Sequence, residues 1–502
     1  MAKEIQLDAN GKRKFGMMDK LAYAAGDLGC NMSFGLKGTV QTFWLAYMML
    51  ETGLLSILLL AVQIWDAIND PVIGSLIDAD RRQYKMGKFK TYIFIGACGL
   101  IIGGAAIFLP FPNAGVVLKS VLFIIGYIIW DAAYTTANVP YGSMLSLVTE
   151  DAGERAQLSS WRSIGSGIGN ILPGIILPML IWHKVTDDNG DPVINPDTGV
   201  QEQILLGDRV FWAALLMGVI GFACFFFMIK KITIRVDENS VKTNESAGKF
   251  NVVAAFGNFV KNRPAVGATV AAMGMFLGMQ SASTASTIMF ATYFGMAELS
   301  GLIQMIGFVP AFAFIPFIKK IVDKYGKKEA SVVGTLVSVI GSVIMLFFPL
   351  FSNKTISLVI FMLGLVVFGL GMGVYTCVSW ALMADAIDYN DWKTGKREEG
   401  TVYSLHSFFR KLAQGVGPSV VLAVMGVLGY VSENGTGGQT AGTAYNMCWL
   451  VAGLYCFSAI MMFVGLTFIY NLDKKTLATM QADLEARHAG AAEDTKEIVV
   501  EA

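Results

Sequence analysis

Long apolar stretches alternate with short polar segments along nearly the whole chain. Each stretch is about as long as the ~20 residues that a helix needs to cross the hydrocarbon core of a bilayer. The pattern predicts an all-α membrane protein with twelve transmembrane helices. The predicted spans are residues 20–50, 54–79, 91–111, 114–147, 158–182, 208–230, 264–294, 299–322, 331–351, 355–387, 401–430 and 443–470.

Composition and loop charge add an orientation to this pattern. Hydrophobic residues make up 54% of the chain and charged residues 15%, whereas soluble domains carry about 25% charged residues. Lys and Arg gather in the N-terminal segment and in the loops after the second, sixth and eighth spans, while the loop after the fifth span is acidic. By the positive-inside rule we expect both termini in the cytoplasm and a multi-pass protein of the cell (inner) membrane. Residues 1–20 are polar, so we expect no cleavable signal peptide.

Two pairs of loop motifs indicate an internal repeat. DADRRQYKMGKFK after the second span resembles VDKYGKKEA after the eighth, and GERAQLSSWR resembles GKREEGTVYS at nearly the same offset, close to half the chain. The repeat predicts two pseudo-symmetric six-helix bundles, an arrangement that places a substrate at mid-membrane. The expected segments are a cytoplasmic N-terminal segment (1–19), an N-terminal bundle (20–230), a cytoplasmic linker (231–263), a C-terminal bundle (264–470) and a cytoplasmic tail (471–502).

Two aspartates stand inside the second apolar span, in the sequence WDAINDP. Asp66 and Asp70 are four residues apart, so a helix places both carboxylates on one face. A charge at mid-bilayer costs at least ~2.5–3.5 kcal/mol. Asn69 adds an amide, and Pro71 frees a backbone carbonyl one turn back. These oxygens favour a site for Na⁺ or a proton. A buried salt bridge to another span is the alternative, and the two are compatible because the pair needs a countercharge when no cation is bound.

The fourth span carries a polar stripe. Asp131, Tyr134, Thr135 and Asn138 occupy positions i, i+3, i+4 and i+7 of one helix face. Such a stripe faces protein or water rather than lipid. Thr135 could lend its hydroxyl to the cation, and Tyr134 and Asn138 could bind a polyol. Contacts between helices through Thr and Asn are the alternative reading.

Basic side chains in two other spans could balance these acids. Arg162 lies in the fifth span, and Arg410 and Lys411 are adjacent in the eleventh. Neighbouring residues of a helix point about 100° apart, so we expect only one of the latter two to face inward. We expect Arg162 or Lys411 to be the countercharge.

Further candidates come from the first, fifth and tenth spans and from the cytoplasmic loops. Asp27 and Asn31 share a helix face, and aromatic side chains suit the apolar face of a sugar ring. The remaining predicted substrate-binding residues are Trp161, Tyr375, Thr376 and Trp380. The predicted gating residues are Arg81, Lys88, Asp385, Asp388 and Arg397.

The chain contains no Walker loop, no GxSxG and no HExxH motif. ATP-driven transport and hydrolysis therefore have no support, and we expect a protein that is not an enzyme. The six cysteines show no metal-ligand spacing and lie in predicted spans. We expect no cofactor beyond a coupling cation, and no nucleic-acid partner. The expected partners are a small solute, a monovalent cation and the lipid bilayer, with a monomeric protein.

The motifs WDAINDP and GKFK, together with GERAQLSSWR and MADAIDYNDWKTGKREEG, resemble the glycoside–pentoside–hexuronide:cation symporters. This family, of which melibiose permease is the familiar member, is a branch of the major facilitator superfamily. The resemblance covers roughly residues 20–470. It implies that Asp66 and Asp70 bind Na⁺, H⁺ or Li⁺, which makes them the metal ligands in a sodium-coupled protein, with Asn69 and Thr135 as helpers. It also implies that Tyr134, Arg162 and Lys411 bind a sugar.

The chain departs from this pattern in its sugar site. Asn31, Asn138 and Gly142 stand where melibiose permease has two aspartates and a tryptophan, and Asp131 or Asp27 could replace the missing anions. We therefore expect a secondary transporter that imports a glycoside or oligosaccharide of the pentoside, hexoside or hexuronide class with Na⁺ or H⁺. The alternatives are a symporter for a non-sugar solute and a sugar-binding receptor that does not transport.

Overall fold

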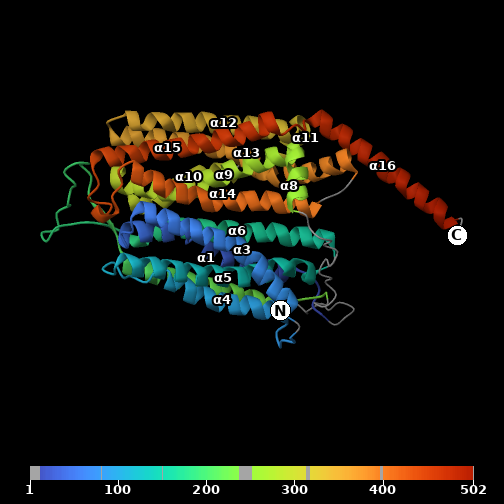
Figure 1. Ribbon diagram of the computed structural model, residues 1–502, viewed down its shortest axis with the longest axis horizontal. Coiled ribbons are helices and arrows are strands. Elements are labelled where there is room, and N and C mark those ends of the chain that lie inside the picture. Colours follow the sequence, from blue (N-terminus) through green and yellow to red (C-terminus); the bar gives the residue numbers. More distant parts are fainter. Residues whose placement is uncertain are drawn as a thin grey trace, which may run out of the picture. The chain divides into compact units, whose positions relative to one another are not determined.

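The computed structural model describes residues 12–80, 82–149, 151–236, 252–312, 317–395 and 399–500 (Figure 1). Each predicted span coincides with helical structure. The first span is divided into α1, α2 and a π-helical turn, η1, with Gly35 and Leu36 between α1 and α2. In the first half of the chain the elements are α1 (Met17–Phe34), α2 (Lys37–Thr42), η1 (Phe43–Tyr47), α3 (Thr52–Ala79), α4 (Lys88–Ala106), α5 (Val116–Val148), α6 (Ala152–Ile181) and α7 (Gly207–Lys231).

The second half of the chain is also helical. Its eighth span is formed by α10 and α11, and short turns of π- or 3₁₀-helix follow several long helices. The elements are α9 (Arg263–Met289), η2 (Phe290–Phe294), η3 (Ala297–Leu299), α10 (Ser300–Phe312), α11 (Ile318–Tyr325), α12 (Lys327–Phe347), η4 (Phe348–Leu350), α13 (Lys354–Thr394), α14 (Glu399–Val427), η5 (Ser432–Asn434), α15 (Ala441–Val464) and η6 (Gly465–Ile469).

The all-α prediction is confirmed, with a small addition. Within the described ranges, nine helices are long and apolar enough to cross a membrane, and a further apolar helix is shorter. Two strands, β1 (Trp182–Lys184) and β2 (Gln203–Leu205), form an antiparallel hairpin that pairs Trp182 with Leu205 and Lys184 with Gln203. Two helices lie outside the predicted spans, α8 (Val252–Lys261) in the expected linker and α16 (Lys474–Val500) in the expected tail.

The chain divides into two compact units. Unit 1 comprises Met1–Ala247, Thr284–Met305 and Ser419–Met447, and unit 2 comprises Gly248–Ser283, Ile306–Pro418 and Cys448–Ala502. Two segments from the second half of the sequence thus pack with the first six spans. The boundaries of the two six-helix bundles stay a prediction.

Close packing of α6 on α1 positions polar side chains inside unit 1. Glycines at 165 and 169 lie against the backbone of α1, where an added Cβ atom would collide with Ala24 and Leu28. Small residues of this kind allow membrane helices to approach closely. The contact brings the middle of α6 within reach of Asp27 and Asn31.

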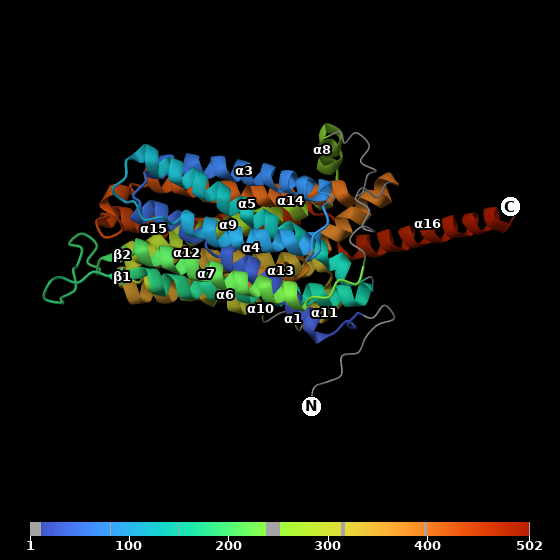
Figure 2. The same ribbon diagram turned by 90° about the horizontal axis from the view of Figure 1, so that it is seen from below.

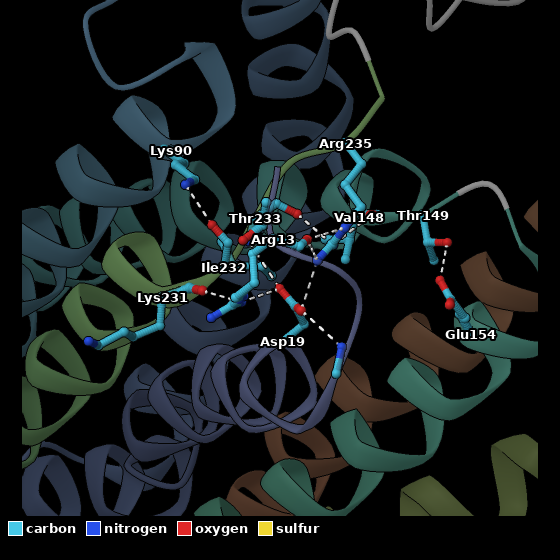
Figure 3. A network of polar contacts seen from close by, with 11 residues as sticks. Arg13, Asp19, Lys90, Val148, Thr149, Glu154, Lys231, Ile232, Thr233 and Arg235 are labelled. Carbon is cyan, nitrogen blue, oxygen red and sulfur yellow. Dashed lines mark hydrogen bonds and ion pairs between the residues drawn. The ribbon is translucent and has the colours of Figure 1, made fainter. Parts of the chain in front are cut away.

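A buried ionic network closes one end of unit 1 (Figure 3). Asp19, with a fully buried side chain, accepts hydrogen bonds from Arg13 at 2.6 Å and from Arg235 at 3.0 Å. The backbone N–H of Thr233 donates to the same carboxylate, and Arg235 also donates to the carbonyl of Val148. The network therefore ties together the chain before α1, the end of α5 and the chain after α7.

The hairpin β1–β2 lies at the end of unit 1 opposite to the start of α1 (Figure 2). Gln203, only 1% exposed, donates to Gly295 O at 2.8 Å and to Glu298 Oε2 at 2.6 Å, and accepts from Ala297 N–H. Asn195 donates to the carbonyls of Gly437 and Gln439. We call these contacts of Asn195 and Gln203 the hairpin clasp, because they join the loop 182–206 to the segments 284–305 and 419–447 of the same unit.

We expect Asp19→Asn to destabilise the protein strongly. Removing one partner from a buried ionic network leaves charges uncompensated and costs about 3–5 kcal/mol. The control is Asp151→Asn at the N-cap of α6, where Asp and Asn cap about equally well. The measurement is thermal unfolding of the purified proteins in detergent. Equal melting temperatures of the two variants would contradict a stabilising role of the network.

We also expect Gln203→Ala to weaken unit 1. The change leaves the buried partners of Gln203 without their hydrogen bonds, and each unsatisfied buried group lowers the stability by about 1–3 kcal/mol. Gln201→Ala is the matched control, because the half-buried Gln201 side chain donates to Val185 O, at 3.0 Å, within the same loop. The apparent melting temperature should fall further for Gln203→Ala than for Gln201→Ala, and the reverse order would refute the clasp.

Candidate functional site

Helices α3 and α5 bring together the residues predicted to bind a cation. The buried Asn69 amide donates to Asp131 Oδ2 and to Thr135 Oγ1, both at 3.1 Å. Thr135 in turn donates to Asp70 Oδ1 at 2.8 Å. Adjacent residues of α3 and two residues of α5 that are one helical turn apart thus form one chain of hydrogen bonds across the helix pair. Asp131, predicted among the substrate residues, contacts Asn69 of this group.

The countercharge of Asp66 comes from a residue to which the sequence analysis gave no role. Lys37, at the start of α2, has its Nζ atom 3.7 Å from Asp66 Oδ2. Asp131 interacts electrostatically with both Asp66 and Lys37. The expected countercharge Arg162 pairs with a different aspartate, and Lys411 belongs to unit 2.

The group has the chemistry of a hard-cation site. Its polar atoms are carboxylate, amide and hydroxyl oxygens, which Na⁺ prefers. Lys37 lies near the carboxylates of Asp66 and Asp131, and Asp70 joins the group through its hydrogen bond from Thr135. In the part of the chain that the structure describes, no three His, Cys, Asp or Glu side chains converge closely enough to hold a metal by themselves. A cation here would therefore need oxygen atoms of Thr135, Asn69 or the backbone as well.

A second polar cluster in unit 1 surrounds Arg162. Its Nε atom donates to Asp27 Oδ1 at 3.0 Å, and its guanidinium lies 5.1 Å from the Tyr141 ring centroid. Asn31 donates to Asp27 Oδ2 at 3.0 Å and accepts from Asn170 at 2.8 Å. Of the two aspartates considered as replacements for the missing anions, Asp27 is the one that pairs with Arg162.

The remaining substrate candidates of unit 1 lie near α1. Tyr134 approaches Phe34 with ring centroids 6.0 Å apart, and Asn138 accepts a long contact from Cys30 Sγ at 3.6 Å. Trp161 is half-buried one residue before Arg162. The polar stripe of α5 therefore divides: Asp131 and Thr135 meet α3, whereas Tyr134 and Asn138 meet α1.

In unit 2, Arg410 lies between aromatic rings. Its guanidinium is 5.2 Å from the Phe276 centroid and 5.3 Å from that of Trp380, which is 52% exposed. Trp380 also stacks on Tyr403. Among the described residues, Arg410 Nε has no hydrogen-bond partner. The adjacent Lys411 has an exposed side chain, so both cations reach the surface of α14 in part.

Two other candidates of α13 are placed differently from each other. Tyr375 is 1% exposed and packs inside unit 2, so its ring is not available to a solute in this conformation. Thr376 is exposed, and its hydroxyl bonds the carbonyl of Met372 at 2.9 Å. Thr376 and Trp380 are thus the two exposed residues among the three α13 candidates for substrate binding.

The predicted gating residues are only partly described. Asp385 accepts two hydrogen bonds from Lys327, at 2.7 and 2.8 Å, and Asp388 and Lys88 also have interaction partners. Arg81 and Arg397 lie outside the described residues.

Asp80, beside the predicted gating residue Arg81, is held by tyrosines. Hydrogen bonds from the hydroxyls of Tyr84 and Tyr92 lower the pKa of Asp80 to about 2. This carboxylate therefore remains ionised at neutral pH.

Sequence reasoning missed partners rather than the central residues. Lys37 is a charged residue of the first apolar span and therefore needs a partner, but its position in the sequence does not identify Asp66 as that partner. Asn170 stands one turn after Ser166 on the same face of α6, and the two side chains lie together beside Asn31. The sequence offers no signal for which aspartate meets which base.

Comparisons with known proteins agree with this architecture. The family described as MFS/sugar transport protein matches residues 22–474. The chain is 27% identical to the uncharacterized symporter YjmB of Bacillus subtilis, over 95% of this chain and 97% of the other. It is 26% identical to the isoprimeverose transporter of Lactiplantibacillus pentosus (94% and 92% covered) and 25% identical to the glucuronide carrier protein homolog of Escherichia coli (91% and 93% covered).

Solved structures show the same fold. The inward open conformation of the xylose transporter XylE from E. coli matches with a TM-score of 0.56 at 15% identity, over 92% of this chain and 98% of the other. The family match spans most of the sequence. The chain therefore belongs to the MFS/sugar transport family, and it is a multi-pass membrane transporter rather than an enzyme.

Proposed function

We propose that the protein imports a glycoside or oligosaccharide together with Na⁺ or H⁺ by alternating access. The observation that carries the proposal is the hydrogen-bonded group of Asn69, Asp70 and Thr135 beside Asp66. Carboxylates at this depth need a positive partner in every state of the cycle. The similarity to a symporter and to sugar carriers supports coupling of this kind.

The arrangement of unit 1 supports coupling between cation and sugar. Helix α5 carries Thr135 of the cation group and Tyr134 next to it, and α1 carries Asp27 and Asn31. A cation that fixes α5 against α3 also fixes Tyr134. Binding of one ligand then favours binding of the other by the same factor in both directions.

The proposed location is the cell (inner) membrane with both termini in the cytoplasm. The Lys- and Arg-rich loops of the sequence support this orientation. It places the hairpin clasp on the outer side.

The charges of the seventh and eleventh predicted spans favour an acidic sugar within the proposed class. Residues 264–294 and 401–430 contain no Asp or Glu, although Arg410 and Lys411 lie in the second of these spans. The carboxylate of Asp385 is engaged by Lys327. Arg binds planar carboxylates bidentately, and its aromatic neighbours suit a sugar ring. The similarity to a glucuronide carrier supports an acidic sugar. The similarity to an isoprimeverose transporter is the reason to retain neutral glycosides in the proposed substrate class.

We expect Asp70→Asn and Asp66→Asn each to lower cation-stimulated sugar uptake by proteoliposomes about tenfold or more, because each removes an anionic cation ligand. Asp188→Asn, in an exposed loop, is the matched control. Full cation dependence in both variants would refute the cation site. Binding of sugar without accumulation in the wild type would show a receptor instead.

We expect wild-type protein to bind methyl β-D-glucuronide more tightly than methyl β-D-glucoside, which differs only at C6. Arg410→Gln should lower the affinity for the glucuronide by about 10–100-fold, the usual loss when a hydrogen bond to a charged group is removed, and leave the affinity for the glucoside unchanged. Ligand-induced thermal shifts measure both affinities. Tighter binding of the glucoside, or equal losses for the two sugars, would contradict the assignment of Arg410 to an acidic group.

A further inference from the structure

Lys37 puts a positive charge inside the candidate cation site. Its ammonium lies 3.7 Å from Asp66 Oδ2, and its side chain is only 23% exposed. Asp131 interacts with the same two side chains. The chain thus already supplies one monovalent cation to the carboxylates that are proposed to bind another.

The local backbone brings Lys37 to this place. Helix α1 ends at Phe34, and Gly35 turns the chain against Pro173 of α6, where an added Cβ atom would lie 3.0 Å from the Pro173 side chain. Helix α2 begins at Lys37. A helix N-terminus carries a partial positive charge and repels a cation. The nearby Phe34 ring, 4.8 Å from Nζ, attracts it only weakly, so the aspartates are its main partners.

The contact with Asp66 is loose compared with other ion pairs of the chain. Arg162 approaches Asp27 to 3.0 Å, and Lys327 approaches Asp385 to 2.7 Å. Charge-assisted hydrogen bonds are about 2.7–2.9 Å long, so Lys37 at 3.7 Å compensates charge without a short hydrogen bond. Its flexible four-carbon side chain can move without a change of backbone.

We propose that Lys37 is a built-in competitor for the coupling cation at Asp66, an inference that rests on the proposed coupling. When Na⁺ or Li⁺ binds, the ammonium leaves Asp66. When the cation departs, the ammonium returns and compensates the carboxylates of Asp66 and Asp131. Lys37 therefore sets the affinity for the cation, and it lets the unloaded carrier change conformation without an uncompensated pair of like charges.

The test compares Na⁺ and Li⁺ binding to purified wild-type protein with that to Lys37→Met and Lys37→Arg. Calorimetric titration at fixed pH uses choline chloride to hold the ionic strength constant. Lys230→Met is the matched control, since Lys230 also lies over a phenylalanine ring, at 5.4 Å from Phe226, but has an exposed side chain on a different helix. We expect Lys37→Met to bind Na⁺ about fivefold more tightly or better, because two unit charges at this distance interact by about that factor even in bulk water.

The outcomes separate this inference from the proposed function. Tighter binding in Lys37→Met, or binding that appears only in this variant, supports competition, and Lys37→Arg should remain close to wild type. Unchanged affinity in Lys37→Met, or no Na⁺ and Li⁺ binding by either protein, overturns it. Sugar uptake by the wild type, measured in parallel, shows whether coupled transport itself holds.

Discussion

The pairing of charges within a low-dielectric interior is the constraint on which this structure depends. Among the described residues, three of the ion pairs join different helices: Lys37 with Asp66, Arg162 with Asp27, and Lys327 with Asp385. Breaking a buried pair costs several kcal/mol, so these contacts fix which helices are neighbours. The polar groups that a transporter needs are therefore also the groups that align its helices.

The first span, formed by α1 and α2, and helix α5 contribute to both polar clusters of unit 1. Helix α5 presents Thr135 to α3 and Asn138 to α1, while the break after α1 allows Asp27 and Lys37 to serve different clusters. The two clusters thus share no hydrogen bond described above, but they are connected because the first span and α5 carry residues of both. A shift of α5 that improves one set of contacts changes the other, which is a physical route for linkage between two ligands.

The spans and the central acids could be predicted because they depend on periodicity along one helix. A run of apolar residues identifies a span, and the spacing of Asp66, Asn69 and Asp70 identifies one face. Pairings between helices could not be predicted, because periodicity does not say which faces meet. The chain alone therefore did not reveal Lys37 as the partner of Asp66, the burial of Tyr375 or the hairpin β1–β2.

The hairpin clasp recognises main chain more than side chains. Gln203 and Asn195 bind carbonyl and N–H groups of residues 295–297 and 437–439, and these groups are the same whatever amino acid occupies the position. The contact therefore requires Gln203 and Asn195 themselves, whereas the segments opposite them can change in sequence and still form these hydrogen bonds. Among homologous chains, sequence variation is then expected in the segments 295–297 and 437–439 rather than at Gln203 and Asn195.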